Sequence, residues 1–251
     1  MKSLQKIPSS LHELQTAYDR LYRGWMGEHR NIGQTERIFS LLDIQPGKRL
    51  VDIACGLGYL ADMAAERGLD AVGIDVSKIA LKKAKQECEH VGMLLLGDAE
   101  RLPWPDHTFD YAVNLGSLEH FIDPAAAVRE MQRILKPDGH AVLLLPNSHH
   151  IRAIYSVYKY GEVFPDLQDF ERFATRVEWE RLLAENGLRV LSVHKYDTGM
   201  ARVYKKGNTV FWYLYNILFR LFGRWIPLNL TYTFIFICEP GSWADDKPAR
   251  V

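Results

Sequence analysis

Residues 49–61 read RLVDIACGLGYLA: a short apolar run that contains an aspartate and leads into two glycines two positions apart. Gly56 and Gly58 let the backbone adopt conformations that other residues avoid, and they let it pass close to a ligand. A helix that begins near Tyr59 directs its free N–H groups into the same space. The stretch therefore predicts a strand, a ligand-binding turn and a helix; the alternative is a tight turn that binds nothing.

Apolar runs and helical stretches alternate along the chain from this point. The apolar runs cover 49–54, 71–74, 93–96, 109–115 and 141–145, and helical spacing fills 59–67, 77–90 and 124–135. Short strands that alternate with helices predict βαβ units, and hence a doubly wound α/β fold whose mostly parallel sheet is buried on both faces. The segment LKPDG at 135–139 predicts the end of a helix and a turn into the next strand.

Composition excludes several classes of protein. The chain has 251 residues, of which 47% are hydrophobic and 25% charged, as in a globular domain. Lys plus Arg and Asp plus Glu both number 31, so no net field favours nucleic acid as a partner. The three cysteines form no zinc pattern or disulfide framework, and we expect no metal. The first residues lack the apolar core of a signal peptide, so we expect a reducing, cytoplasmic compartment.

The glycine turn suits two classes of cofactor. Gly56, Gly58 and Ala61 satisfy the G-x-G-x-x-G/A pattern of dinucleotide-binding proteins, and Asp75 ends the second strand where a ribose hydroxyl would be held. S-adenosylmethionine also has a ribose, but it carries an ammonium group and no pyrophosphate. Asp52, four residues before Gly56, suits that ammonium and would repel a pyrophosphate. As an alternative, Asp52 caps the helix or braces the turn.

Four segments in order resemble the class I S-adenosylmethionine-dependent methyltransferases, in particular the branch that acts on small molecules, quinones and lipids. The resemblance covers about residues 45–147. VDIACGLGYLA resembles the first motif of the family, whose usual form has Gly where Ala54 stands, and GIDVS at 73–77 resembles the second. GDAERLPWPDHTFD at 97–110 is similar to the third motif, and NLGSLEHF at 114–121 to the loop after the fourth strand.

The resemblance implies a fold and a cofactor. It implies a Rossmann-like sheet of seven strands with an antiparallel last strand, and S-adenosylmethionine as methyl donor with S-adenosylhomocysteine as product. Asp75 would bind the ribose, Asp98 would accept from the adenine amino group, and Ala99 would offer its backbone; Asp98 is otherwise a simple turn residue. The whole expected cofactor set is Asp52, Ala54, Cys55, Gly56, Gly58, Asp75, Val76, Asp98, Ala99, Asn114, Leu115 and Gly116.

The sequence divides into four parts of one methyltransferase domain. We expect an N-terminal helical cap at 1–46, a cofactor-binding core at 47–146, a helical substrate-facing insertion at 147–187, and C-terminal strands with an aromatic helix at 188–251.

Candidate reacting residues follow the expected strand ends. Methyl transfer from a sulfonium depends mainly on holding the nucleophile in line, and a general base is optional. His120 titrates near neutral pH and is our candidate base; the alternative is that it braces its loop or contacts the cofactor. His149 and His150 are candidate substrate residues or plain loop residues. Tyr18 and Tyr22 are candidate substrate residues. The resemblance implies that their segment folds over the cofactor as a lid, and the alternative is that the two rings pack their helix.

No motif in this sequence identifies the methyl acceptor. We expect a small or lipid-linked molecule with an apolar part, methylated on oxygen first and carbon next. Enzymes that methylate the amines of nucleic-acid bases resemble one another in an N-P-P-Y or D-P-P-Y segment at this position. Residues 114–117 here read NLGS, which argues against nucleic acid as the substrate. The alternatives are an NAD(P)-dependent oxidoreductase and a non-catalytic cofactor-binding interaction module.

Residues 209–225, TVFWYLYNILFRLFGRW, have a very wide apolar face with arginines at its edge. They are too short and too charged to span a bilayer well. Two interpretations compete: burial against the domain or a second subunit, and peripheral contact with a membrane or a lipid substrate.

Overall fold

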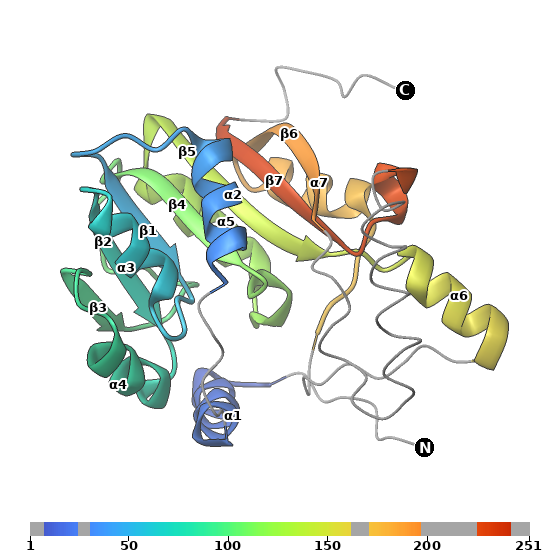
Figure 1. Cartoon of the computed structure of the whole chain (residues 1–251), viewed down its shortest axis with the longest axis horizontal. Coiled ribbons are helices and arrows are strands. Elements are labelled where there is room, and N and C mark those ends of the chain that lie inside the picture. Colours follow the sequence, from blue (N-terminus) through green and yellow to red (C-terminus); the bar gives the residue numbers. More distant parts are fainter. Residues whose placement is uncertain (1–7, 25–30, 162–170, 197–224, 242–251) are drawn as a thin grey trace.

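The computed structural model describes residues 8–24, 31–161, 171–196 and 225–241, and its strands form one mixed sheet in the order β3-β2-β1-β4-β5-β7-β6 (Figure 1). Neighbouring strands from β3 to β5 pair in parallel, whereas β7 runs antiparallel to both β5 and β6. This confirms the predicted seven-stranded sheet with an antiparallel last strand. The strands are β1 (Arg49–Ile53), β2 (Asp70–Asp75), β3 (Met93–Leu96), β4 (Phe109–Leu115), β5 (Leu135–Pro146), β6 (Leu188–Tyr196) and β7 (Thr233–Pro240).

Capping residues set the start of most helices. Asn31, Ser77, Asp123 and Thr175 each accept a backbone N–H at a helix N-terminus, which supplies a partner that the first turn lacks. The helices are α1 (Leu11–Gly24), α2 (Ile32–Leu42), α3 (Tyr59–Glu66), α4 (Lys78–Glu87), α5 (Pro124–Ile134), α6 (Ile151–Tyr160) and α7 (Arg176–Glu185), with short 3-10 turns at η1 (Leu118–His120) and η3 (Leu228–Leu230).

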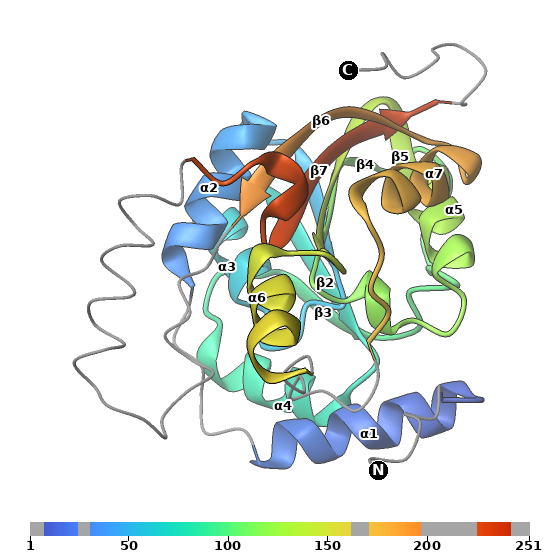
Figure 2. The ribbon, with the colours of Figure 1, turned by 90° about the vertical axis from the view of Figure 1, so that its right-hand side faces the viewer.

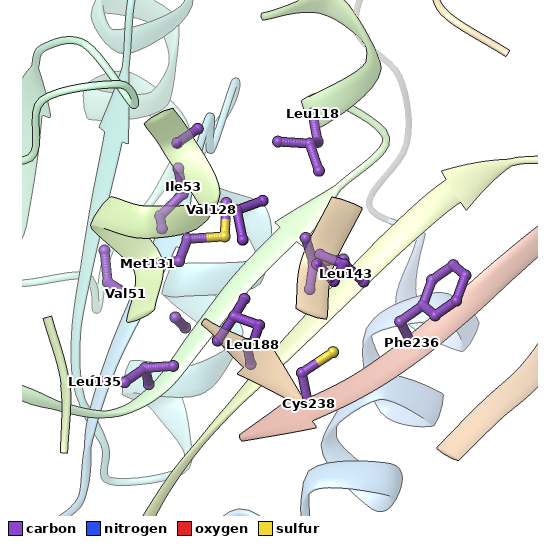
Figure 3. Close-up of a cluster of buried hydrophobic side chains, with 14 of the residues drawn as sticks. Val51, Ile53, Leu118, Val128, Met131, Leu135, Leu143, Leu188, Phe236 and Cys238 are labelled. Carbon is purple, nitrogen blue, oxygen red and sulfur yellow. The ribbon is translucent and has the colours of Figure 1, made fainter. Parts of the chain in front are cut away.

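Alternating side chains of the central strands build a core on each face of the sheet. In β5, Ala141, Leu143 and Leu145 pack with α5 and α7, while Val142 and Leu144 pack with α2 and α3. Figure 3 shows the first cluster, in which side chains from β1, β5 and β7 meet those of α5. Burial of both faces explains why these strands read as continuous apolar runs.

One local expectation differs from the structure. The LKPDG segment was predicted as a turn between helix and strand, but β5 already begins at Leu135, directly after α5. Leu135 pairs with Phe109 and His140 with Tyr111, so the residues between them bulge opposite Asp110. The ammonium of Lys136 lies 2.8 Å from that carboxylate and holds the bulge to the sheet. The Pro and Gly therefore bend a strand rather than precede it.

Two helices lie at the edge where the parallel strands end. Figures 1 and 2 place α1 beneath the carboxyl ends of the strands and α6 at the outer rim of the same edge. Within the described part of the chain, every helix is too short or too polar to cross a bilayer. Apart from Trp225, the aromatic segment 209–225 lies outside the described residues, and the boundaries at 46, 146 and 187 stay predictions.

Candidate functional site

The turn after β1 has the left-handed backbone that its glycines predict. Ala54, Gly56 and Gly58 have φ angles of 60°, 52° and 73°. Gly58 is the N-cap of α3 and has no side chain with which to cap it, so the first turn of this helix depends on groups from elsewhere.

One such group is Asp52. It lies near the end of β1, 5% exposed, and its carboxyl group accepts a hydrogen bond from the backbone N–H of Ala61 in α3. Burial, followed by the nearby charge of Asp75, raises the pKa of Asp52 to about 7. A buried acid in this state is stabilised by a cation placed beside it. The bracing role that the sequence left open is therefore real, and it does not exclude binding of a cationic ligand.

Asp75 joins the glycine turn to the loop after β2. One carboxylate oxygen accepts the N–H of Gly56 at 2.8 Å, and the other accepts the N–H of Ser77 at 2.7 Å. Burial raises the pKa of Asp75, and these two hydrogen bonds oppose the rise. The carboxylate thus sits at the junction of two loops with its charge held by backbone amides.

Asp75 also lines a cavity at the carboxyl edge of the sheet, under α1. Seven of its lining residues are expected site residues: Tyr18, Tyr22, Ala54, Asp75, Val76, Asp98 and Ala99. The others are Leu11, Leu14, Ile74, Gly97, Glu100, Ser117 and Phe121. Asp98 accepts the N–H of Glu100 at 2.9 Å, so it closes a turn and faces the cavity at once.

Helix α1 is fixed across this cavity by polar contacts with the loop after β2. Gln15 donates to the carbonyl of Val76 at 3.0 Å. The carboxylate of Asp19 accepts the hydroxyl of Ser77 at 2.6 Å and the N–H of Ile79 at 3.2 Å. This helix, which lies in the region expected as an N-terminal cap, is therefore tied to the start of α4.

Two tyrosines of α1 point into the site. The hydroxyl of Tyr22 lies over the glycine turn, where a Cβ added to Gly56 would be 2.5 Å from it. Burial and then the charge of Asp75 raise the pKa of Tyr22, and burial and then the charge of Glu119 raise the pKa of Tyr18. Both phenols are therefore protonated donors at neutral pH.

The loop after β4 braces the site from below. The amide of Asn114 donates to the carbonyl of Ile53 at 2.9 Å and accepts the N–H of Leu118 at 3.0 Å, so it ties β4 to β1. Leu115 pairs with Leu144 of β5. Gly116 has a φ of 65° and donates to the carbonyl of Leu144 at 3.0 Å. None of these three expected cofactor residues is among those that line the cavity, and neither are Asp52, Cys55, Gly56 and Gly58.

His120 belongs to a cluster of titratable groups. Its Nε2 lies 3.8 Å from a carboxylate oxygen of Glu119, both side chains are buried, and the edge of its ring meets Tyr18 at 6.3 Å between centroids. Ligand-type atoms of Glu119, His120 and Glu171 all lie within 4.8 Å of one another. Two carboxylates and an imidazole at this spacing can hold a proton or a cation.

Arg172 fixes this cluster to the β4 loop. Its backbone N–H donates to the carbonyl of Glu119 at 3.0 Å, and its guanidinium donates to the carbonyls of Phe121 and of Ile122, the latter at 3.0 Å. Glu171, which lies in the region expected as a substrate-facing insertion, is thereby held at the site.

The two other candidate histidines, His149 and His150, make contacts within the loop after β5 and at the start of α6. His150 caps α6, because its Nδ1 accepts the N–H of Ala153 at 3.1 Å, and its ring meets Tyr232 edge-on at 4.7 Å. His149 contacts the hydroxyl of Ser148 at 2.7 Å. Neither is among the residues that line the cavity.

Sequence reasoning missed part of the site. Asp19, Gln15 and Glu171 carry no motif, because their role depends on how two distant segments pack. Ser117 and Phe121 lie within the NLGSLEHF segment and Glu100 directly follows Ala99, so their position beside motif residues was the available signal.

Comparison with known proteins agrees with this geometry. Residues 51–143 match the family model described as a methyltransferase domain. The demethylmenaquinone methyltransferase of Bacillus licheniformis is 31% identical over 189 residues, which cover 66% of this chain and 81% of that protein. The ubiquinone/menaquinone biosynthesis C-methyltransferase of Paraburkholderia phytofirmans is 28% identical over 192 residues, which cover 72% and 76% of the two chains.

A solved structure shows the same fold. The geranyl diphosphate C-methyltransferase of Streptomyces coelicolor superposes with a TM-score of 0.65 at 15% identity, over 93% of this chain and 100% of that one. Motifs, sheet and relatives agree, and the chain belongs to the class I S-adenosylmethionine-dependent methyltransferases.

Proposed function

We propose that this enzyme methylates a ring carbon of a quinone-type acceptor that carries a lipid tail. The observation that supports this best is the likeness, over most of the chain, to a demethylmenaquinone methyltransferase and to a quinone-biosynthesis C-methyltransferase. The sequence alone favoured oxygen over carbon as the acceptor atom; these relatives give no support to oxygen, and we propose carbon instead. The oxidoreductase alternative gains no support from the family or from the relatives.

The residues at the carboxyl edge fit the methyl donor, which supplies a methyl group on a sulfonium. Asp52 would hold the ammonium of the amino-acid end, and that cation would in turn favour the charged form of this buried carboxyl group, whose pKa burial raises. Asp75 would accept from the ribose hydroxyls, and Asp98, which lines the same cavity, would accept from the adenine amino group. Gly56 and Gly58 hold the left-handed backbone that this turn requires. The Tyr22 hydroxyl occupies the space beside Gly56, so it would move aside for the ligand to reach the turn.

The chain's own part in the reaction is to place the acceptor and to move protons. A hydroquinone ring is most nucleophilic at carbon when one hydroxyl is deprotonated. His120, flanked by Glu119 and Glu171, takes that proton. After the new carbon–carbon bond has formed, the ring carbon releases its proton to water, which restores the aromatic ring as a phenolate, and the imidazolium of His120 returns its proton to that oxygen. Because a sulfonium donor would lose its positive charge on transfer, we expect the chain to contribute more by positioning the acceptor in a closed site than by stabilising charge.

Two measurements test this function. Calorimetry on the full chain should show binding of S-adenosylhomocysteine and no binding of NAD. Incubation with S-adenosylmethionine and a reduced, short-tailed demethylated naphthoquinone should give a product with one more methyl group on ring carbon, identified by mass spectrometry and NMR. A methyl ether as product, or binding of NAD in place of S-adenosylhomocysteine, would overturn the proposal.

The role of His120 has its own readout. His120→Gln should lower kcat strongly and remove the acidic limb of its pH profile, with the affinity for S-adenosylhomocysteine unchanged. A variant that loses cofactor affinity and keeps the pH profile of kcat would assign His120 to the cofactor rather than to the proton.

A further inference from the structure

Helix α6 presents its large apolar side chains to solvent. The side chains of Ala153 and Ser156, which are small, are buried against the protein. Ile154, Tyr155, Val157, Tyr158 and Tyr160, which are large, are between 48% and 88% exposed. An amphipathic helix of a globular protein normally does the reverse. A cluster of large apolar side chains on the surface marks a contact with something outside the fold.

The exposed side chains of α6 lie at the same edge of the sheet as the cavity. Helix α6 begins shortly after β5, at the edge of the sheet that carries the cavity, and Figure 1 shows it projecting at the rim of the molecule; Figure 2 looks onto it from that side. The segment that leads into β7 adjoins its start, because the rings of His150 and Tyr232 meet there. Trp225, at the head of that segment, is 73% exposed.

Charge and side-chain type indicate a lipid surface rather than a protein partner. From His150 to Gly161 the chain carries Arg152 and Lys159 and no acidic residue. The Lys159 ammonium lies 5.6 Å from the centre of the Tyr155 ring and 5.1 Å from that of Tyr160. Tyrosine and tryptophan favour the boundary between headgroups and acyl chains, where one end of the side chain is apolar and the other wet. Basic charge beside them complements anionic headgroups.

We propose that α6, together with Trp225, is the surface by which this enzyme docks on an anionic bilayer, with α6 lying in the plane of the headgroups. The inference rests on the proposed lipid-linked acceptor, whose tail keeps it in the membrane. Docking through α6 holds the carboxyl edge of the sheet, and with it the cavity, next to the layer from which that acceptor enters.

Sedimentation with vesicles tests this surface. The full chain is mixed with phosphatidylcholine vesicles with or without phosphatidylglycerol. The test variant combines Ile154→Ser, Tyr155→Ser and Tyr158→Ser. Its matched control combines Val177→Ser and Leu191→Ser, which remove apolar side chains that are also about half exposed, on α7 and β6. A third variant, Lys159→Glu, reverses the charge beside the tyrosines.

We expect the wild type and the control to bind vesicles that contain phosphatidylglycerol. The α6 triple variant should bind at least about tenfold more weakly, since three side chains that would enter the interface are lost. Lys159→Glu should weaken binding to anionic vesicles only. Binding of S-adenosylhomocysteine and turnover of a short-tailed acceptor in solution should be unchanged in all variants, which shows that they fold.

Three results would overturn the inference. The wild type does not bind anionic vesicles; or the triple variant binds them as well as the control does; or ultracentrifugation shows that the triple variant breaks a dimer while no form binds vesicles, which would assign α6 to a second copy of the chain. Turnover of the short-tailed acceptor separates these results from a failure of the proposed function, because that reaction needs no membrane.

Discussion

The fold raises the pKa of Asp52 by burying its carboxyl group. Its pKa of about 7 lies well above the value of 3.8 expected without burial. Between about pH 4 and pH 7 the folded chain therefore binds a proton that the unfolded chain releases, and the free energy of unfolding falls as pH rises through that window. The loss amounts to a few kcal/mol at most, on the order of 1.4 kcal/mol for each unit of pKa difference.

Asp52→Asn tests this dependence. The amide cannot titrate, so we expect a weaker fall of the free energy of unfolding between about pH 4 and pH 7, measured by urea unfolding at several pH values. The variant should also bind S-adenosylhomocysteine more weakly, because the carboxylate no longer faces the ammonium. An unchanged slope of stability against pH would show that Asp52 does not carry the buried proton.

Ala54 occupies a backbone conformation that suits glycine. Its φ of 60° lies in the left-handed region, which costs an L-residue about 1–2 kcal/mol. Ala54→Gly removes that strain from the folded chain. It also makes the unfolded chain more flexible, which lowers the free energy of unfolding by roughly 0.5–1 kcal/mol. We expect a change in stability within about 1 kcal/mol, in the stabilising direction, and full cofactor binding.

Ala54→Val is the matched contrast. A β-branched side chain tolerates the left-handed region poorly, so we expect a destabilisation of about 2 kcal/mol or more in urea unfolding. If the Val variant is as stable as the Gly variant, the turn does not have the backbone described here.

At this scale the sequence predicted residue types better than contacts. Asp75 and Asp98 were expected at the site and both line the cavity. Asn114 was expected among them, yet its amide is used to tie Ile53 to Leu118. A motif marks such a residue without telling whether its polar atoms face a ligand or the backbone.

Helix α1 is the element on which access to the cavity depends. The carboxylate of Asp19 holds it to Ser77 and to the N-terminus of α4. Asp19→Ala removes both hydrogen bonds, so we expect faster proteolysis within residues 8–24 and a KM for S-adenosylmethionine raised several-fold, with kcat little changed.

Thr16→Ala, on the exposed side of the same helix, is the control for general loss of helicity. S-adenosylhomocysteine should slow the proteolysis of the wild type more than that of Asp19→Ala. If the ligand protects both proteins equally, the contacts of Asp19 do not contribute to cofactor binding.

The strands were more predictable than the joints between them. Continuous apolar runs foretold β1, β4 and β5 because a sheet buried on both faces requires them. The bulge at 136–139 was not foreseen, since Pro and Gly mark a bend in the chain and not the kind of bend. The inverted packing of α6 was not foreseen either, because periodicity shows that a helix has two faces and not which one is buried.

For the whole molecule, cofactor binding should couple to global stability. A ligand that binds only the folded chain, at about 100 times its Kd, raises the free energy of unfolding by about 2.7 kcal/mol. For a domain of this size that corresponds to a rise in Tm of about 5–10 °C. We expect S-adenosylhomocysteine to produce this shift in differential scanning fluorimetry and NAD to produce none.

Asp75→Ala provides the control for that shift. It removes the acceptor for the N–H groups of Gly56 and Ser77 as well as the expected ribose contact, so both Tm and its response to S-adenosylhomocysteine should fall. A full response in the variant would place the ligand elsewhere on the chain.

The central claim is that the crevice between the glycine turn, Asp75 and Asp98 binds the methyl donor. A crystal structure of the full chain with S-adenosylhomocysteine tests it most directly. Our account predicts the adenosine between Asp75 and Asp98, with the amino-acid end beside Gly56 and Asp52. Electron density for the ligand at any other place, or a crevice that stays filled by Tyr22 at saturating ligand, would contradict it.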